Sequence, residues 1–389
     1  MRKSENKRIV WRAAKWCATL LFALFSFLYL YCMQSDLMAC YQYILSDGVT
    51  SYNPLVGSIV IVSILVGIGE MLAYFWSLPA AFVALSYFPS ALILVLLTCA
   101  IPSHGSIVYD SASWVWLCVV LSVGCLLVYF LKKNSLLFVQ DKYSLTDIWP
   151  NILVLFLLFV FVGGVGNTND VLHDQLKAER LLRNNESQAL LKLTKTSKNT
   201  EHSFLAIKAL AMAENGSLPD KLFAETDVSC NENLLVEPSS FLSCDSLEYR
   251  FYDFWKARPG EYAKNNPDFF FEKLSKRKEV DSLYSMRMAD YYLCTLLLQR
   301  NLEQFAAEVR NFYPINDSLP RYYKEALVLY NRTHMNSLYV YCDNAVEENY
   351  LDFIKMQKES SSPKVNQNRL KRTFGNTYWY YYTRNEQNN

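Results

Sequence analysis

The sequence predicts an all-α protein in which a bundle of about five transmembrane helices precedes a soluble domain of helical repeats. Five stretches contain no Asp, Glu, Lys or Arg and are long enough to cross a bilayer, which takes roughly 20 mostly apolar residues; they are residues 16–35, 48–69, 71–109, 111–131 and 148–169. After them, apolar residues recur at helical spacing in a charged background. We therefore expect a transmembrane domain over residues 1–166 and a soluble helical domain over residues 167–389.

The first expected span, residues 16–34, directly follows a cluster of basic residues, which are Arg2, Lys3, Lys7, Arg8, Arg12 and Lys15. Basic residues flanking a span stay on the cytoplasmic side of the membrane, so this cluster places the N-terminal end in the cytoplasm. No cleavage site of small residues follows the apolar run. We therefore expect a retained signal-anchor helix instead of a cleaved signal peptide.

The other expected spans are residues 55–76, 80–101, 114–131 and 148–166. The fourth expected span ends at Lys132 and Lys133, which again indicate the cytoplasmic side. Tryptophan residues fall near the ends of the spans, as is typical of the membrane interface; they are Trp16, Trp76, Trp114 and Trp149. An odd number of spans places the C-terminal domain outside the cytoplasm, in the periplasm.

The span count depends on residues 55–101, where only Glu70 and a short turn separate two spans. If this region crossed the membrane once, the C-terminal domain would be cytoplasmic. A segment of about 47 residues is far too long for one crossing. We therefore keep five spans.

The C-terminal half reads as antiparallel helix pairs joined by short turns. The best example has one helix over Leu283–Gln299, a turn at Arg300 and Asn301, and a second helix over Leu302–Phe312; a new helix begins after Pro320. This unit is close to the 34-residue period of tetratricopeptide repeats, in which each unit buries its apolar face by stacking on its neighbours. The alternative is an irregular helical bundle without a true repeat.

Composition narrows the function. The formal net charge is +1, which lacks the strongly basic footprint of a nucleic-acid-binding protein. The chain has 10 cysteines, but the soluble half contains no CxxC pair, so we expect no zinc site and no thioredoxin-like site. No other motif indicates a cofactor, and we expect none. Cys230 and Cys244 are close enough in sequence to form a disulfide in an oxidising compartment. The alternative is two unpaired cysteines in a loop.

Three residues are candidates for a functional site. Glu70 is the one ionisable residue well inside an expected span, and such carboxylates are costly and often functional. The alternative role for Glu70 is helix pairing or reaching the interface. His104 and Asp110 share the short loop between the third and fourth spans, where they form a potential acid–base pair. The alternative is that both are solvated loop residues.

Aromatic residues crowd the end of the chain, where residues 378–382 read Tyr-Trp-Tyr-Tyr-Tyr. We expect this block to cap the last helical layer, because a repeat array needs closed ends. The alternative is an anchor at the membrane interface, where Trp and Tyr beside basic residues bind well.

Short segments of the C-terminal half resemble signatures of a known family; they are residues 206–211, 215–218, 222–223, 319–326 and 374–381. Together they are similar to a family of uncharacterised polytopic membrane proteins from Bacteroidota with a tetratricopeptide-like C-terminal domain. The resemblance covers mainly residues 167–389. It implies an inner-membrane protein of a two-membrane bacterium and supplies no catalytic residues. Family members can have more spans, so the short membrane half here is a departure.

These observations favour a binding protein over an enzyme. We expect the soluble domain to act as an interaction scaffold or assembly factor for other envelope proteins, with the lipid bilayer as the second partner and the oligomeric state left open. The alternative is a membrane-embedded enzyme or small transporter that uses Glu70 together with His104 and Asp110. Five spans without an internal repeat are few for a secondary transporter.

Overall fold

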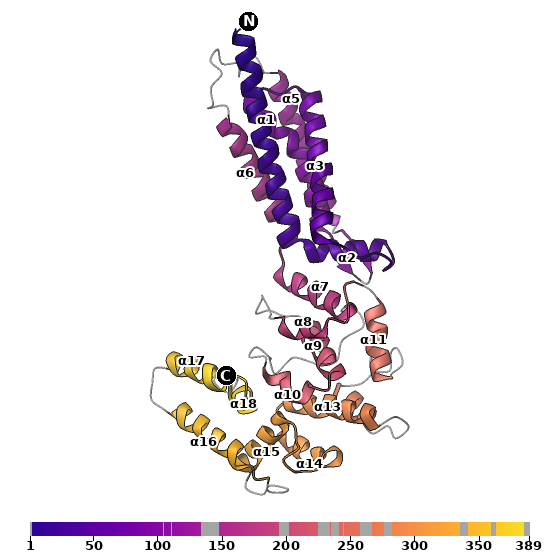
Figure 1. Cartoon of the computed structure of the whole chain (residues 1–389), viewed down its shortest axis with the longest axis vertical. Coiled ribbons are helices and arrows are strands. Elements are labelled where there is room, and N and C mark those ends of the chain that lie inside the picture. Colours follow the sequence, from indigo (N-terminus) through magenta and orange to yellow (C-terminus); the bar gives the residue numbers. More distant parts are fainter. Residues whose placement is uncertain are drawn as a thin grey trace. The chain divides into compact units, whose positions relative to one another are not determined.

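A computed structural model describes the protein over residues 2–103, 105–109, 111–133, 148–193, 202–224, 234, 241–243, 245–256, 267–275, 282–334, 341–358 and 363–384. The chain forms two compact units. The N-terminal unit contains Met1–Lys177 with Leu242–Cys244, and the C-terminal unit contains the rest. Helices make up nearly all of the regular structure in the described residues, so the all-α prediction is confirmed (Figure 1).

The N-terminal unit is built from apolar helices and one short hairpin. Its elements are α1 (Arg2–Leu28), the π-helix η1 (Tyr29–Met33), α2 (Ser35–Leu45), α3 (Pro54–Trp76), the 3₁₀ helix η2 (Ala80–Tyr87), α4 (Phe88–Cys99), β1 (Ile101–Ser103), β2 (Ser106–Val108), α5 (Ser111–Lys133) and α6 (Ile148–Val165). The two strands pair antiparallel.

Four segments of this unit are long and apolar enough to cross a membrane; they are Trp11–Met33, Pro54–Trp76, Ala80–Cys99 and Ile148–Val165. They match four of the five expected spans. The remaining one, residues 114–131, falls within α5, where an apolar helix runs over Cys118–Phe130. The count of five spans, the boundary at residue 166 and the orientation stay predictions.

The third expected span is not one regular helix. It begins as η2, in which Phe82 has non-helical backbone angles, and becomes α-helical only at Phe88. The Asn151 side chain on α6 compensates for this irregularity, because its Oδ1 accepts from the Ala84 amide (2.8 Å) and its Nδ2 donates to the Ala80 carbonyl (2.8 Å). Irregular backbone at membrane depth is tolerated where protein groups satisfy it. The expected loop after the first span also differs, since α2 occupies much of it.

Helices α1, α3, α4 and α6 all pack against η2, which therefore lies at the centre of the unit. Their inward faces form a buried apolar core that includes Phe22, Leu65, Leu94 and Leu158. Their outward faces expose large apolar side chains, for example Ile64 on α3 and Phe156 on α6. A helix that exposes such residues along its whole length is typical of a protein whose solvent there is lipid.

The C-terminal unit is also helical. Its elements, with α7 shared between the units, are α7 (Asp170–Arg183), α8 (Ser187–Lys192), α9 (His202–Glu214), α10 (Leu218–Lys221), the 3₁₀ turn η5 (Leu222–Ala224), α11 (Asp245–Trp255), α12 (Pro267–Ser275), α13 (Ser282–Leu298), α14 (Leu302–Phe312), α15 (Arg321–Thr333), α16 (Asn344–Lys358), α17 (Pro363–Phe374) and α18 (Tyr378–Arg384).

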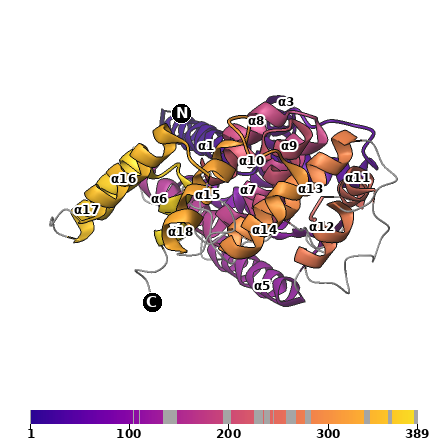
Figure 2. The same ribbon diagram turned by 90° about the horizontal axis from the view of Figure 1, so that it is seen from below.

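The predicted helix pair is confirmed as α13 and α14. Arg300, with φ of 61°, makes the turn between them. Asn301 then caps α14, because its side chain accepts from the Gln304 amide (3.1 Å). Helix α15 follows with Pro320 at its N-cap. Helices α16 and α17 pack against each other as a second hairpin, side by side in Figure 1 and overlapping when seen from below in Figure 2. The tetratricopeptide-like repeat stays a prediction.

The aromatic block at the end of the chain is buried, and its role as a cap of a repeat array stays a prediction. Tyr378, Trp379, Tyr380 and Tyr381 of α18 all lie in the core of the C-terminal unit. Tyr378 and Tyr381 surround Phe223 at ring distances of 5.1 and 4.8 Å. The block is therefore part of a packed core and is not an exposed membrane anchor.

Candidate functional site

Of the predicted site residues, Glu70 alone lies among the residues that the structure describes. It lies on α3 about two turns before the helix ends at Trp76. Its Oε1 accepts hydrogen bonds from the Thr19 hydroxyl (2.7 Å) and the Tyr87 hydroxyl (2.8 Å), and its Oε2 forms an ion pair with the Lys15 ammonium.

Local sequence explains how these partners meet. Lys15 and Thr19 are four residues apart on α1, so they share one helix face. Tyr87 is the last residue of η2, and its ring lies over Gly69, where a Cβ would collide with it. The Phe22 ring stacks on the Tyr87 ring, with 4.7 Å between the ring centroids.

The Glu70 cluster, defined as Glu70, Lys15, Thr19 and Tyr87, joins α1, α3 and η2. Both carboxylate oxygens are engaged and a cation compensates the charge. Removing one member of such a pair leaves an uncompensated charge at low dielectric, which is strongly destabilising. The geometry therefore ties three elements together at one end of the bundle, which fits the helix-pairing alternative for Glu70.

A second polar cluster lies at the other end of α1, and the sequence reading missed it. Gln34, which is fully buried, donates through Nε2 to the Tyr29 hydroxyl (3.2 Å) and to the Asn167 carbonyl (2.9 Å). Tyr29 in turn donates to Thr98 Oγ1 (3.3 Å), and His173 Nε2 contacts the same Asn167 carbonyl (3.1 Å). Short π-helical segments such as η1 are frequent at functional sites. The sequence signal that could have predicted this cluster is Gln34, a polar residue at the end of the first apolar run.

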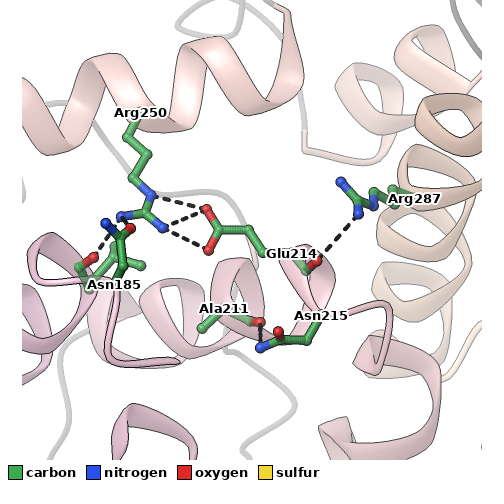
Figure 3. Close-up of polar contacts among 7 residues, drawn as sticks. Asn185, Ala211, Glu214, Asn215, Arg250 and Arg287 are labelled. Atoms are coloured by element: carbon green, nitrogen blue, oxygen red, sulfur yellow. Dashed lines mark hydrogen bonds and ion pairs between the residues drawn. The ribbon is translucent and has the colours of Figure 1, made fainter. Parts of the chain in front are cut away.

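Figure 3 shows a polar cluster of the C-terminal unit that centres on Arg250 of α11. Its guanidinium donates to both oxygens of Glu214 (2.8 Å each from NH2) and to the Asn185 side chain (2.8 Å) and Leu182 carbonyl (2.6 Å). Arg287 NH2 donates to the Glu214 carbonyl (3.3 Å). Two-pronged pairing of this kind fixes geometry, so Arg250 holds the ends of α7 and α9 against α11.

A buried carboxylate forms a fourth cluster. Asp290 on α13 accepts through Oδ1 from the hydroxyls of Tyr313 (2.6 Å) and Tyr323 (3.0 Å). Burial raises the pKa of Asp290 from 3.8 to about 6, while the two phenol hydrogen bonds oppose this rise. The carboxylate links α13 to α15 and to the residue that ends α14.

Glu325 on α15 positions the C-terminal helix. Its Oε2 accepts from the Tyr378 amide (2.6 Å) at the start of α18, and its Oε1 accepts from Arg321 (2.8 Å). Burial raises the pKa of Glu325, and these two partners oppose the rise. The hydroxyls of Tyr378 and Tyr381 donate to the carbonyls of Leu297 (3.0 Å) and Leu298 (2.6 Å).

The other predicted site residues are not placed. His104, Asp110, Cys230 and Cys244 lie outside the described residues. The predicted acid–base pair and the predicted disulfide therefore stay predictions. Among the described residues, no group of three or more His, Cys, Asp or Glu is arranged to hold a metal ion.

Comparison with known proteins gives one finding. Residues 258–385 are similar to a family of unknown function, DUF6057. No curated protein and no solved structure matches the chain. The matched region runs from just after α11 through α18, so it contains the Asp290 cluster, Glu325 and the buried aromatic block.

Proposed function

We propose that the protein is an integral membrane protein whose C-terminal unit is an interaction scaffold for other envelope proteins, on the periplasmic side of a bacterial inner membrane. The observation that supports this proposal most is that the two units differ: one has span-length apolar helices, and the other has a core of its own. The N-terminal unit has four helices long and apolar enough to span a bilayer. The C-terminal unit closes its own core, and its polar clusters join helices to each other.

A small group of exposed apolar side chains suggests where a partner would bind. Leu283 and Met286 lie one turn apart near the start of α13 and are both exposed, whereas Met288 and Leu293 further along the same helix are fully buried. Contiguous exposed apolar surface marks interaction sites, and we propose that this pair forms part of such a surface.

Photo-crosslinking in cells tests this proposal on the full chain. A photoreactive amino acid at position 283 and one at position 286 should crosslink to the same protein partner. The matched control is position 303 on α14, where Glu303 is exposed, and it should give no such product. A lack of crosslinks at both 283 and 286 would contradict the proposed surface.

The alternative function, a membrane enzyme or small transporter, draws support from one observation. Glu70 lies beside η2, and carboxylates next to interrupted helices are found at the binding sites of transporters. Its test compares Glu70→Gln with His104→Ala in cells under a condition where deletion of the protein slows growth. Unchanged growth of both variants would count against this alternative, and loss of growth with intact protein levels would favour it over the scaffold.

A further inference from the structure

One end of the N-terminal unit combines exposed aromatic side chains with a high density of basic residues. Three contacts identify the elements that meet at this end. The Trp11 indole of α1 donates to the carbonyl of Leu78, in the turn that follows α3 (3.4 Å). Leu78 packs in one cluster with Val128, near the end of α5. Asn151, in the first turn of α6, bonds to η2 shortly after Leu78.

Aromatic side chains ring this end of the bundle. Each of them is more than half exposed, and together they come from four helices: Trp16 of α1, Tyr74 and Phe75 of α3, Tyr129 and Phe130 of α5, and Trp149 of α6. Tryptophan and tyrosine at the ends of apolar helices mark the level of the lipid headgroups. We therefore place the membrane interface at this ring.

The basic residues lie just beyond the ring. Helix α1 runs without a break from Arg2 to Leu28, so its charged first part continues the axis of its apolar part. At 1.5 Å per residue, Arg12 lies at the level of Trp11, Lys7 about 6 Å beyond it and Arg2 about 14 Å beyond it. The headgroup layer is roughly 5–7 Å thick on each side of the hydrocarbon. The backbone of the first turns of α1 therefore lies within or above this layer.

The charge of this segment is not cancelled by its neighbours in sequence. Lys15 is paired with Glu70 and is left out of the count. The remaining basic residues form the basic collar, defined as Arg2, Lys3, Lys7, Arg8 and Arg12, against the single acidic residue Glu5, which leaves a net charge of +4. Lys132 and Lys133 at the end of α5 add two positive charges, and residues 134–147 carry two aspartates and one lysine.

We propose that the basic collar is a binding surface for anionic phospholipid headgroups. The chemistry that fits it is a phosphodiester lipid with net negative charge, because this helix segment runs from the headgroup level outward and its sequence is cationic. Each basic residue near an anionic surface contributes about fivefold in affinity, and the attraction decays within a Debye length. This surface works independently of what the C-terminal unit binds.

The test measures thermal unfolding of the full chain in a neutral detergent with added phosphatidylglycerol or phosphatidylcholine, at about 50 mM and about 500 mM NaCl. We expect phosphatidylglycerol to raise the apparent Tm by about 3 °C or more above the effect of phosphatidylcholine at low salt, and this difference to vanish at high salt. Equal shifts with the two lipids at low salt would overturn the proposal.

Variants locate the effect. The collar variant R2Q/K3Q/K7Q/R8Q/R12Q should lose the phosphatidylglycerol-specific shift. A control variant, K355Q/K358Q/R369Q/K371Q/R372Q, removes the same number of exposed basic residues from α16 and α17 and should keep it. A shift that survives in the collar variant would place the lipid elsewhere and overturn the proposal. If the variant with five substitutions does not fold, the double variant R8Q/R12Q replaces it. The double variant should lose a substantial part of the phosphatidylglycerol-specific shift. An undiminished shift in the double variant would also overturn the proposal.

Discussion

The two units use tryptophan in opposite ways. Trp16 and Trp149 of the N-terminal unit are 66% and 71% exposed, whereas Trp255 and Trp379 of the C-terminal unit are 1% and 0% exposed. Water penalises a large exposed aromatic surface, but the lipid interface favours it. The same residue type is therefore exposed on the apolar helices of the first unit, as a lipid interface favours, and buried in the closed core of the second.

The half-buried Glu70 and the buried Asp290 also differ in their partners. Glu70 in the N-terminal unit has a lysine as its partner, while Asp290 in the C-terminal unit has two phenol hydroxyls. A cation keeps a carboxylate charged, whereas neutral donors compensate only part of the cost of burial. We therefore expect the stability of the C-terminal unit to depend on the protonation of Asp290.

The largest expected effect is at the buried tryptophan of α18. Trp379→Ala removes a fully buried side chain that packs against Tyr350 and Phe353, with ring distances of 5.5 and 6.4 Å. We expect a loss of about 3–5 kcal/mol in the free energy of unfolding of the C-terminal unit, from lost burial and the cavity left behind. Chemical denaturation followed by circular dichroism measures it. The control Tyr249→Ala, at an exposed site, should change stability by about 0.5 kcal/mol or less.

The next largest effect is on the pH dependence of stability. Because the folded-state pKa of Asp290 is raised from 3.8 to about 6, the folded protein binds the proton more tightly than the unfolded chain does. Stability from this group is therefore greatest below about pH 4, falls as the pH rises to about 6, and is constant above that, with a total change of about 3 kcal/mol.

Asp290→Asn isolates this contribution, since the amide oxygen still accepts from Tyr313 and Tyr323 but does not titrate. The free energy of unfolding, measured by denaturation between pH 4 and pH 8, should fall more steeply with rising pH for the wild type than for the variant. The variant should also be the more stable protein at pH 7. Parallel pH profiles would show that Asp290 does not titrate in this range.

A smaller effect is expected at the Glu70 cluster. Lys15→Met keeps most of the side-chain volume but leaves the carboxylate without a cation, and we expect the apparent Tm in detergent to fall by several degrees, equivalent to about 2 kcal/mol. The double variant Lys15→Met/Glu70→Gln should recover most of the loss, because no unpaired charge remains. A double variant as unstable as Lys15→Met alone would mean that packing, and not charge, carries the effect.

The smallest effect is expected at the exposed tryptophans. Trp16→Ala should leave the apparent Tm in detergent within about 1 °C of the wild type, because few protein contacts are lost. In liposomes the same variant should show altered protease accessibility of the N-terminal segment, since an interfacial anchor is removed. A large loss of stability in detergent would show that Trp16 packs against protein.

Local patterns in the sequence predicted much of the fold. The apolar spacing of residues 283–312 predicted all four ends of α13 and α14 to within one residue, because a local turn at Arg300 and Asn301 separates the two helices. The long apolar stretches likewise predicted the four span-length helices. In each case the determining signal lies within the segment itself.

Features that depend on distant residues were not predictable. The break in the third span depends on Asn151, which lies 67 positions from its partner Ala84. Glu70 was identified as a candidate, but Lys15, Thr19 and Tyr87 were not recognised as its partners. The Arg250–Glu214 pair and the Gln34 cluster were also missed, because hydrogen bonds between separate helices leave no periodic trace in the sequence.

The most direct test of the central claim is the side of the membrane on which the C-terminal unit lies. A reporter that is active only in the periplasm, fused after Asn389, is compared with a reporter that is active only in the cytoplasm at the same position. The scaffold proposal with five spans predicts activity of the periplasmic reporter alone. Activity of the cytoplasmic reporter alone would contradict the span count and direct the search for partners to the cytoplasm.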